Sequence, residues 1–184
     1  MDATAHQIAS AGAAAVALSD IARAAGVSKA LIHYHFADKE TLLARLVDHL
    51  AEGVVARERA ALAPYEHRHD PLAVDALWLW LERELQRGDL CVLLELDAYR
   101  GAHVRQAARA AAARRQASAE NTVRQLFAIL DLRPRIDASL LGSVLLAFVD
   151  GIAIRHGRDA REDAAPAPRV AFDVFWLAML SLAE

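Results

Sequence analysis

The chain has 184 residues, of which 55% are hydrophobic, a formal net charge of −3 and one cysteine. A single cysteine excludes an internal disulfide, and the slight acidity excludes nucleic-acid binding through an overall positive charge. The high apolar content requires burial beyond an ordinary core, either in a membrane or in a subunit interface. The longest uncharged run in the apolar C-terminal part, residues 138–149, is well short of the roughly 20 residues of a spanning helix, so we expect no membrane partner.

Residues 1–11 are expected to form a short helix that ends at Gly12, with Ala3, Ile8 and Ala11 facing inward. The same segment lacks the basic region and the leucine-rich stretch of a secretory signal. We therefore expect a cytoplasmic protein.

Residues 18–39 have the pattern of a helix-turn-helix. Ile21, Ala22 and Ala25 give a short first helix one apolar face, and Gly26 supplies the positive φ that closes a helix end. Ser28 is a good N-cap for a second helix, whose buried side is either Leu31 or Ile32, followed by Phe36. A turn of about three to four residues that contains a glycine is typical of DNA-binding helix-turn-helix motifs.

The outward side of the second helix carries chemistry that suits DNA. Residues with donors or small apolar groups can contact base edges in the major groove, and their neighbours can bind phosphate. The candidates for base edges are Lys29, Ala30, Leu31 and His33, and those for phosphate are Tyr34, His35 and Lys39, the last together with the start of its helix. Residues 1–50 hold four Lys or Arg against five Asp or Glu, so contact depends on local placement. The alternative is an ordinary solvated helix surface.

The rest of the chain is predicted to be helical. Asp38 caps a long helix that Pro64 stops, and five further helices are expected over residues 71–87, 90–99, 103–131, 137–155 and 170–182. We predict an all-α fold with a helix-turn-helix domain at residues 1–45, linked by the long helix to a helical ligand-binding and dimerisation domain at residues 46–184.

The last two helices are apolar on nearly all sides, so a second surface must cover them. A dimer interface is expected there. Its candidate residues are Leu141, Val144, Leu145, Phe148, Val174, Phe175, Ala178 and Met179.

Several aromatic and polar residues can line a ligand cavity, although core packing explains each of them singly. The pocket candidates are Trp78, Cys91, Glu95, Tyr99, Phe127 and Phe148, with Trp80 and Trp176 as further aromatic residues. Glu95, Asp97 and Asp150 can act as catalytic acids or bases, but pairing with Arg100 or Arg155 is the favoured interpretation.

Enzyme and metal sites are not favoured. Glu66, His67, His69 and Asp70 offer metal-ligand chemistry, yet their spacing is better explained by an exposed polar loop. No phosphate-binding glycine loop or nucleophile elbow occurs. We expect no catalytic residues, no metal and no cofactor.

The segments Ile21-Ala22-x-Ala24-Ala25-Gly26-Val27-Ser28-Lys29 and Tyr34-His35-Phe36-x-x-Lys39-Glu40-x-Leu42-Leu43 resemble the N-terminal domain of the TetR family of bacterial transcriptional regulators. This resemblance implies a homodimer that binds a palindromic operator, usually as a repressor, and is released by a small-molecule effector. The family's DNA contacts carry over onto Ser19, Lys29, Ala30, Leu31, His33, Tyr34, His35 and Lys39, with Ser28 included as the cap of the second helix.

Three positions depart from the family pattern. Ala17 replaces the usual capping Thr or Ser, Ala30 replaces the usual Gly or Pro-like small residue, and His33 replaces the usual tyrosine. An alternative function is a helical dimeric adaptor that does not bind DNA.

Overall fold

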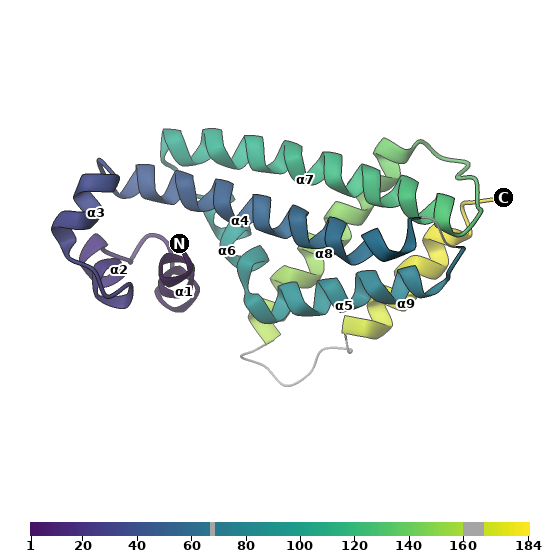
Figure 1. Ribbon diagram of the computed structural model, residues 1–184, viewed down its shortest axis with the longest axis horizontal. Coiled ribbons are helices and arrows are strands. Elements are labelled where there is room, and N and C mark those ends of the chain that lie inside the picture. The colour runs from purple at the N-terminus through teal and green to yellow at the C-terminus, as the bar shows by residue number, and fades with distance from the viewer. Residues whose placement is uncertain (67–68, 160–167) are drawn as a thin grey trace.

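The computed structural model describes residues 1–66, 69–159 and 168–184. Within these ranges the chain forms nine α-helices, one short 3-10 helix and no β-strand, which confirms the predicted all-α fold (Figure 1). The helices are α1 (Asp2–Ala11), α2 (Leu18–Ala24), α3 (Lys29–His35), α4 (Lys39–Leu62), η1 (Ala63–Tyr65), α5 (Leu72–Arg87), α6 (Asp89–Asp97), α7 (Ala102–Ile129), α8 (Ala138–Asp159) and α9 (Pro168–Leu180).

Local signals determine where the N-terminal helices begin and end. Gly12 and Gly26 have φ values of +84° and +66°, and each follows the end of a helix. The Ser28 hydroxyl accepts a hydrogen bond from the Leu31 amide at 3.1 Å and so caps α3. These features agree with the sequence predictions.

Two predicted inward positions are exposed. Ala11 is the last residue of α1 and Ala25 is the C-cap of α2, and both lie at the surface. The chain leaves the helix at each of these positions, so the helical spacing no longer directs their side chains toward the core. The buried residues are Thr4, Ala5 and Ile8 in α1 and Ile21 and Ala22 in α2.

The long helix α4 connects the N-terminal unit, formed by α1–α3, to the helical body, formed by α5–α9. It runs alongside α7 for much of its length, and α3 lies at the end of the molecule far from the C-terminus (Figure 1). Leu43, Leu46 and Leu62 of α4 are fully buried. Because one helix enters both parts, a shift of α4 would move the N-terminal unit relative to the body.

Helices α7 and α8 approach each other closely at Gly142. A Cβ atom at this position would lie 2.8 Å from both Cα and N of Glu120 in α7. The glycine therefore permits a backbone contact that a larger side chain would prevent.

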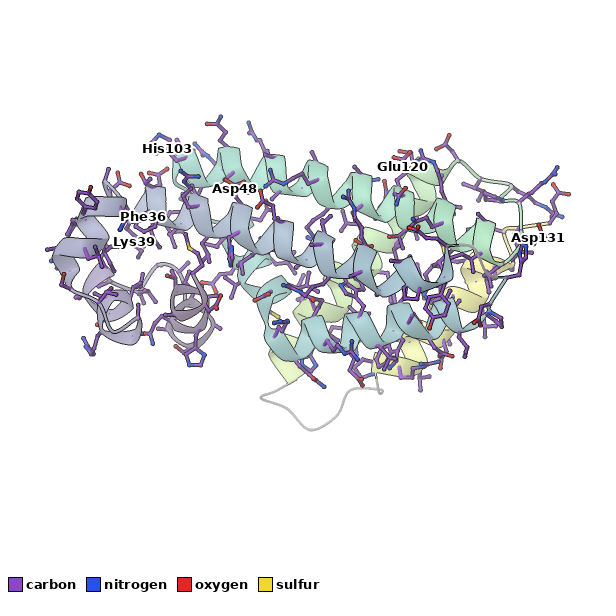
Figure 2. All side chains as sticks on the ribbon, in the orientation of Figure 1. Phe36, Lys39, Asp48, His103, Glu120 and Asp131 are labelled. Atoms are coloured by element: carbon purple, nitrogen blue, oxygen red, sulfur yellow. The ribbon has the colours of Figure 1, made fainter. Side chains whose placement is uncertain are left out.

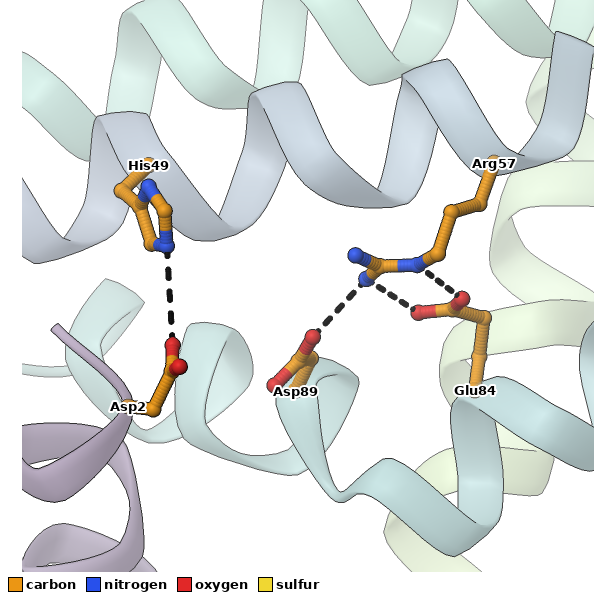
Figure 3. Close-up of polar contacts among 5 residues, drawn as sticks. All are labelled: Asp2, His49, Arg57, Glu84 and Asp89. Atoms are coloured by element: carbon orange, nitrogen blue, oxygen red, sulfur yellow. Dashed lines mark hydrogen bonds and ion pairs between the residues drawn. The ribbon is translucent and has the colours of Figure 1, made fainter.

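Ionic contacts join α4 to the body and join helices within the body. The Arg57 guanidinium donates to both carboxylate oxygens of Glu84, at 2.5 and 2.8 Å, and to Asp89 at 2.8 Å (Figure 3). Asp150 of α8 pairs with Arg115 of α7. The predicted partner of Asp150, Arg155, is exposed instead, because five residues along a helix turn the side chain about 140° away.

Helix α8 contains a stretch, Ala138–Gly157, that is long and apolar enough to cross a membrane by length and composition alone. A helix that packs against other helices can pass the same test. Here the stretch contacts α7 and α9, and it includes the Asp150 carboxylate bound to Arg115. The apolar stretch is longer than the uncharged run of residues 138–149, because it continues past Asp150.

Candidate nucleic-acid interface

Helices α2 and α3 form a helix-turn-helix whose second helix is nearly free on its outer side. Ile21 and Ala22 bury the inner face of α2, and Ile32 buries that of α3. Of the two alternatives for the buried residue of α3, the structure selects Ile32, whereas Leu31 is 43% exposed and Tyr34 is 84% exposed. A short helix held by one apolar contact presents its remaining residues to solvent at the end of the molecule (Figure 1).

The exposed side of α3 brings together most of the residues predicted to contact DNA. Exposed positions are Ser19, Ser28, Lys29, Ala30, Leu31, His33, Tyr34 and His35. Their ammonium, imidazole and hydroxyl groups can donate to bases or phosphates, and the Ala and Leu side chains can contact thymine methyl groups. This surface thus carries the kinds of groups that contact DNA in a major groove.

The start of α4 differs from the predicted phosphate site. Lys39 lies at the start of α4, next to the N-terminal unit (Figure 2), and its Nζ donates to the Ala14 carbonyl at 3.0 Å. The Asp38 carboxylate accepts from the Thr41 amide at 2.7 Å, and hydrogen bonding to Thr41 lowers the pKa of Asp38. A carboxylate thus already occupies the helix start that was expected to bind phosphate, while Lys39 also holds the loop between α1 and α2.

Several of the predicted pocket residues pack against other groups of their own chain. Trp78 packs against Phe172, Phe148 stacks on Phe175 with ring centroids 4.1 Å apart, and Phe127 is 1% exposed in the core. The Cys91 thiol donates to the Ala153 carbonyl at 3.3 Å, and burial raises its pKa. Glu95 lies in α6 and is exposed, and Tyr99, just after α6, is half-buried. These contacts show what holds each side chain in place, and a ligand pocket lined by these residues stays a prediction.

Two small cavities lie inside the body and share Arg115 as a lining residue. One of about 90 Å³ lies among α4, α6, α7 and α8, and one of about 20 Å³ lies beside Glu58 and Trp80. The larger cavity is lined by alanines of α7, including Ala108 and Ala111, whose small side chains leave room for it. Among the residues that the structure describes, the Trp80 indole N–H is buried without a hydrogen-bond partner. Such a group can bind an acceptor of a ligand or a water.

Glu58 is a buried carboxylate beside the smaller cavity. It accepts hydrogen bonds from Ser118 at 2.6 Å and Thr122 at 2.9 Å. Burial raises the pKa of Glu58, and the two hydroxyl groups and the Arg115 charge oppose that shift. Neither Glu58 nor Arg115 is marked by a sequence pattern, because their helical spacing fits both surface and core.

The predicted interface residues fall into two groups. Leu141, Leu145 and Met179 are at most 5% exposed and pack inside their own chain. Val144, Val174 and Ala178 are exposed, and Phe148 and Phe175 are half-buried. The same face of α8 and α9 exposes further large apolar residues: Leu140, Ile154, Val170 and Leu177.

Two carboxylates join the N-terminal unit and the adjoining start of α4 to the body. The Glu95 carboxylate of α6 accepts a hydrogen bond from the backbone amide of Ala13, in the loop after α1. Near the start of α4, Glu40 accepts from the His103 amide at the start of α7, at 2.6 Å. Neither bond has a sequence signal, because each joins residues more than 60 positions apart. Glu95 has this backbone partner instead of the predicted arginine.

The N-terminal part of the chain matches a known family model. Residues 1–46 match the model for bacterial regulatory proteins of the tetR family. The HTH-type transcriptional regulator BetI of Rhizobium meliloti is 38% identical over 104 residues, which are 48% of this chain and 51% of that protein. The match therefore spans about half the length of this relative.

Solved structures share the fold over nearly the full length. A TetR transcription regulator from Haloarcula marismortui superposes with a TM-score of 0.74 at 20% identity, covering 99% of this chain and 95% of that one. The regulator FadR from Bacillus subtilis, solved with stearoyl-CoA, has a TM-score of 0.73 at 17% identity, covering 97% and 95%. Residues 1–46 thus match the N-terminal domain of the TetR family of bacterial transcriptional regulators, and the whole chain shares the fold of solved members of that family.

Proposed function

We propose that the chain is a transcriptional repressor that binds a palindromic DNA operator as a homodimer and is released by a small molecule. The exposed outer face of α3 is the observation that carries this proposal. A packing helix would bury such a face, whereas Tyr34 remains 84% exposed and Lys29 and His33 are exposed beside it. The match of residues 1–46 to the model for bacterial regulatory proteins of the tetR family supports the same function.

DNA binding can be tested by selecting bound duplexes from random sequence. A palindrome should be recovered. Lys29→Ala and His33→Ala should each relax the base preference at defined positions of the site. The free energy that discriminates against the wrong base should fall by about 1–3 kcal/mol for each bidentate contact that is lost. Arg83→Ala, an exposed change in the body, is the matched control. Binding should weaken steeply with salt through counterion release. Failure to recover any sequence would instead support the adaptor without DNA binding.

The homodimer is proposed to form through the exposed apolar face of α8 and α9. Val174 and Leu177 are 61% and 70% exposed, and Leu140 and Val144 extend the same apolar character onto α8. Pairing this face with a second copy would remove it from water and present two recognition helices about one DNA turn apart, roughly 34–36 Å. Leu177→Asp should yield monomers in sedimentation equilibrium, whereas Gln86→Asp, an exposed change on α5, should leave the dimer intact.

The effector site is proposed to be the pair of cavities that meet at Arg115. Their walls are mostly apolar, and the Trp80 indole and Arg115 supply donors. We expect an apolar small molecule with one hydrogen-bond acceptor. A thermal-shift screen should identify compounds that stabilise the protein, and a true effector should also lower operator affinity and lose its effect in Trp80→Phe.

A further inference from the structure

We propose that Glu95 is a positioning residue that fixes the orientation of the DNA-binding domain on the body and thereby determines which operator spacing the dimer accepts. This inference rests on the proposed DNA-binding function. The hydrogen bond from the Ala13 amide to the Glu95 carboxylate is called the latch below.

The latch connects two rigid parts at a well-defined point. Ala13 is 2% exposed and directly follows Gly12, whose φ of +84° turns the chain out of α1. A Cβ at Gly12 would lie 3.4 Å from Glu95 Oε1, so the carboxylate fits closely against this turn. Lys39 Nζ holds the next carbonyl of the same turn, that of Ala14. The loop is therefore fixed from α6 on one side and from α4 on the other.

Beside the latch, the DNA-binding domain and the body are separated by open space. A cavity of about 530 Å³ lies between Ala5, His6 and Ala9 of α1, Arg57 of α4 and Val92 of α6. Helix α1 also contacts α6, and its exposed Asp2 carboxylate lies 3.8 Å from His49 Nε2 of α4 across this cavity (Figure 3). Beside these contacts and α4, the latch ties the loop after α1 directly to α6 and so helps to fix the orientation of the domain.

Helix α6 can also transmit a change from the interior to the latch. Leu93 and Asp97 line the 90 Å³ cavity, and each is two residues from Glu95. Two residues correspond to about 200° of helical rotation, so Glu95 projects from the opposite side of α6. A molecule that enlarged this cavity would displace α6 toward the latch. The Cys91 thiol of α6 donates a hydrogen bond to the Ala153 carbonyl of α8, so a shift of α6 would also change its contact with α8.

The experiment compares Glu95→Ala and Glu95→Gln with wild type on duplexes whose half-site separation is varied by single base pairs. A dimer with firmly held domains distinguishes these spacings, because each base pair rotates and shifts a half-site. We expect Glu95→Ala to bind the preferred spacing about tenfold more weakly and to discriminate less among the others. Glu95→Gln should stay close to wild type, because its amide oxygen can accept the Ala13 N–H. Glu52→Ala, an exposed change on α4, should behave as wild type.

The rate of hydrogen exchange of the Ala13 amide measures the strength of the latch in the absence of DNA. Exchange should accelerate in Glu95→Ala and stay slow in Glu95→Gln. The proposal is overturned if Glu95→Ala keeps the wild-type exchange rate or the wild-type spacing preference, if Glu95→Gln behaves like Glu95→Ala, or if all spacings weaken equally together with a loss of thermal stability. A wild-type protein that selects no DNA, with the exchange pattern as expected, would refute the proposed function and leave the latch as a structural contact only.

Discussion

The ion pair between Arg57 and Glu84 gives the sharpest test of the packing in the body. Glu84 is 1% exposed, and Arg57 donates to both of its carboxylate oxygens (Figure 3). Replacing Arg57 by Met would leave a charged carboxylate buried without its partner. Burial of an uncompensated charge is far more costly than the absence of the whole pair.

The expected loss follows from the exposure of the two groups. Removing one partner of a buried pair costs about 3–5 kcal/mol. Arg57 is 33% exposed and water reaches part of the site, so we expect the lower end, about 3 kcal/mol. For a chain of this length that loss lowers Tm by about 6–12 °C. Asp89 also loses a partner, but at 18% exposure it remains partly hydrated.

Thermal and urea unfolding at neutral pH and fixed protein concentration would measure this effect. The double variant Arg57→Met with Glu84→Met should recover to within about 1 kcal/mol of wild type, because two apolar side chains can replace a buried pair. The exposed Arg83→Met is the matched control and should change stability by less than about 0.5 kcal/mol. The reasoning is refuted if Arg57→Met is as stable as wild type or if the double variant is as unstable as the single one.

Three further substitutions test the local arguments. Gly142→Ala would place a Cβ 2.8 Å from the backbone of Glu120, so α7 and α8 must separate; we expect a loss of about 1–3 kcal/mol in thermal unfolding, and an unchanged Tm would contradict the close approach. Burial raises the pKa of Glu58 above its ordinary value of 4.5, so the folded state retains this proton where the unfolded state has lost it, and stability falls as pH rises from 4.5 through the folded pKa. Glu58→Gln should remove this part of the pH dependence in denaturant melts, and an unaltered profile would argue against it. Ser28→Ala removes the cap on the Leu31 amide and should destabilise α3 by about 1 kcal/mol, measured as faster exchange of that amide.

Much of the N-terminal part was predictable from sequence, because its signals act over a few residues. The glycine after α1 and α2, the cap at Ser28 and the cap at Asp38 each act within one helical turn, and the structure confirms these helix ends. The exposed side of α3 follows from the same spacing once Ile32 is identified as its buried residue. The match of residues 1–46 to the family confirms the motif.

The body was less predictable, because helices that are apolar on nearly all sides do not indicate which side faces inward. Leu141, Leu145 and Met179 were expected at the subunit interface, yet they pack within their own chain. Only the arrangement of α7, α8 and α9 decides which apolar side remains exposed. The sequence likewise does not indicate which residue pairs with a buried charge, because the partner lies on another helix.

The sequence by itself thus determined the helices, their ends and the recognition motif, since caps, glycines and the 3.6-residue period are local properties of the chain. The tertiary structure alone decided that Glu95 binds the amide of Ala13, that Arg115 pairs with Asp150, and that Glu84 lies buried against Arg57. In each case the two groups are 27 or more positions apart in the sequence. Their proximity is set by how whole helices pack, and no short sequence pattern records that packing.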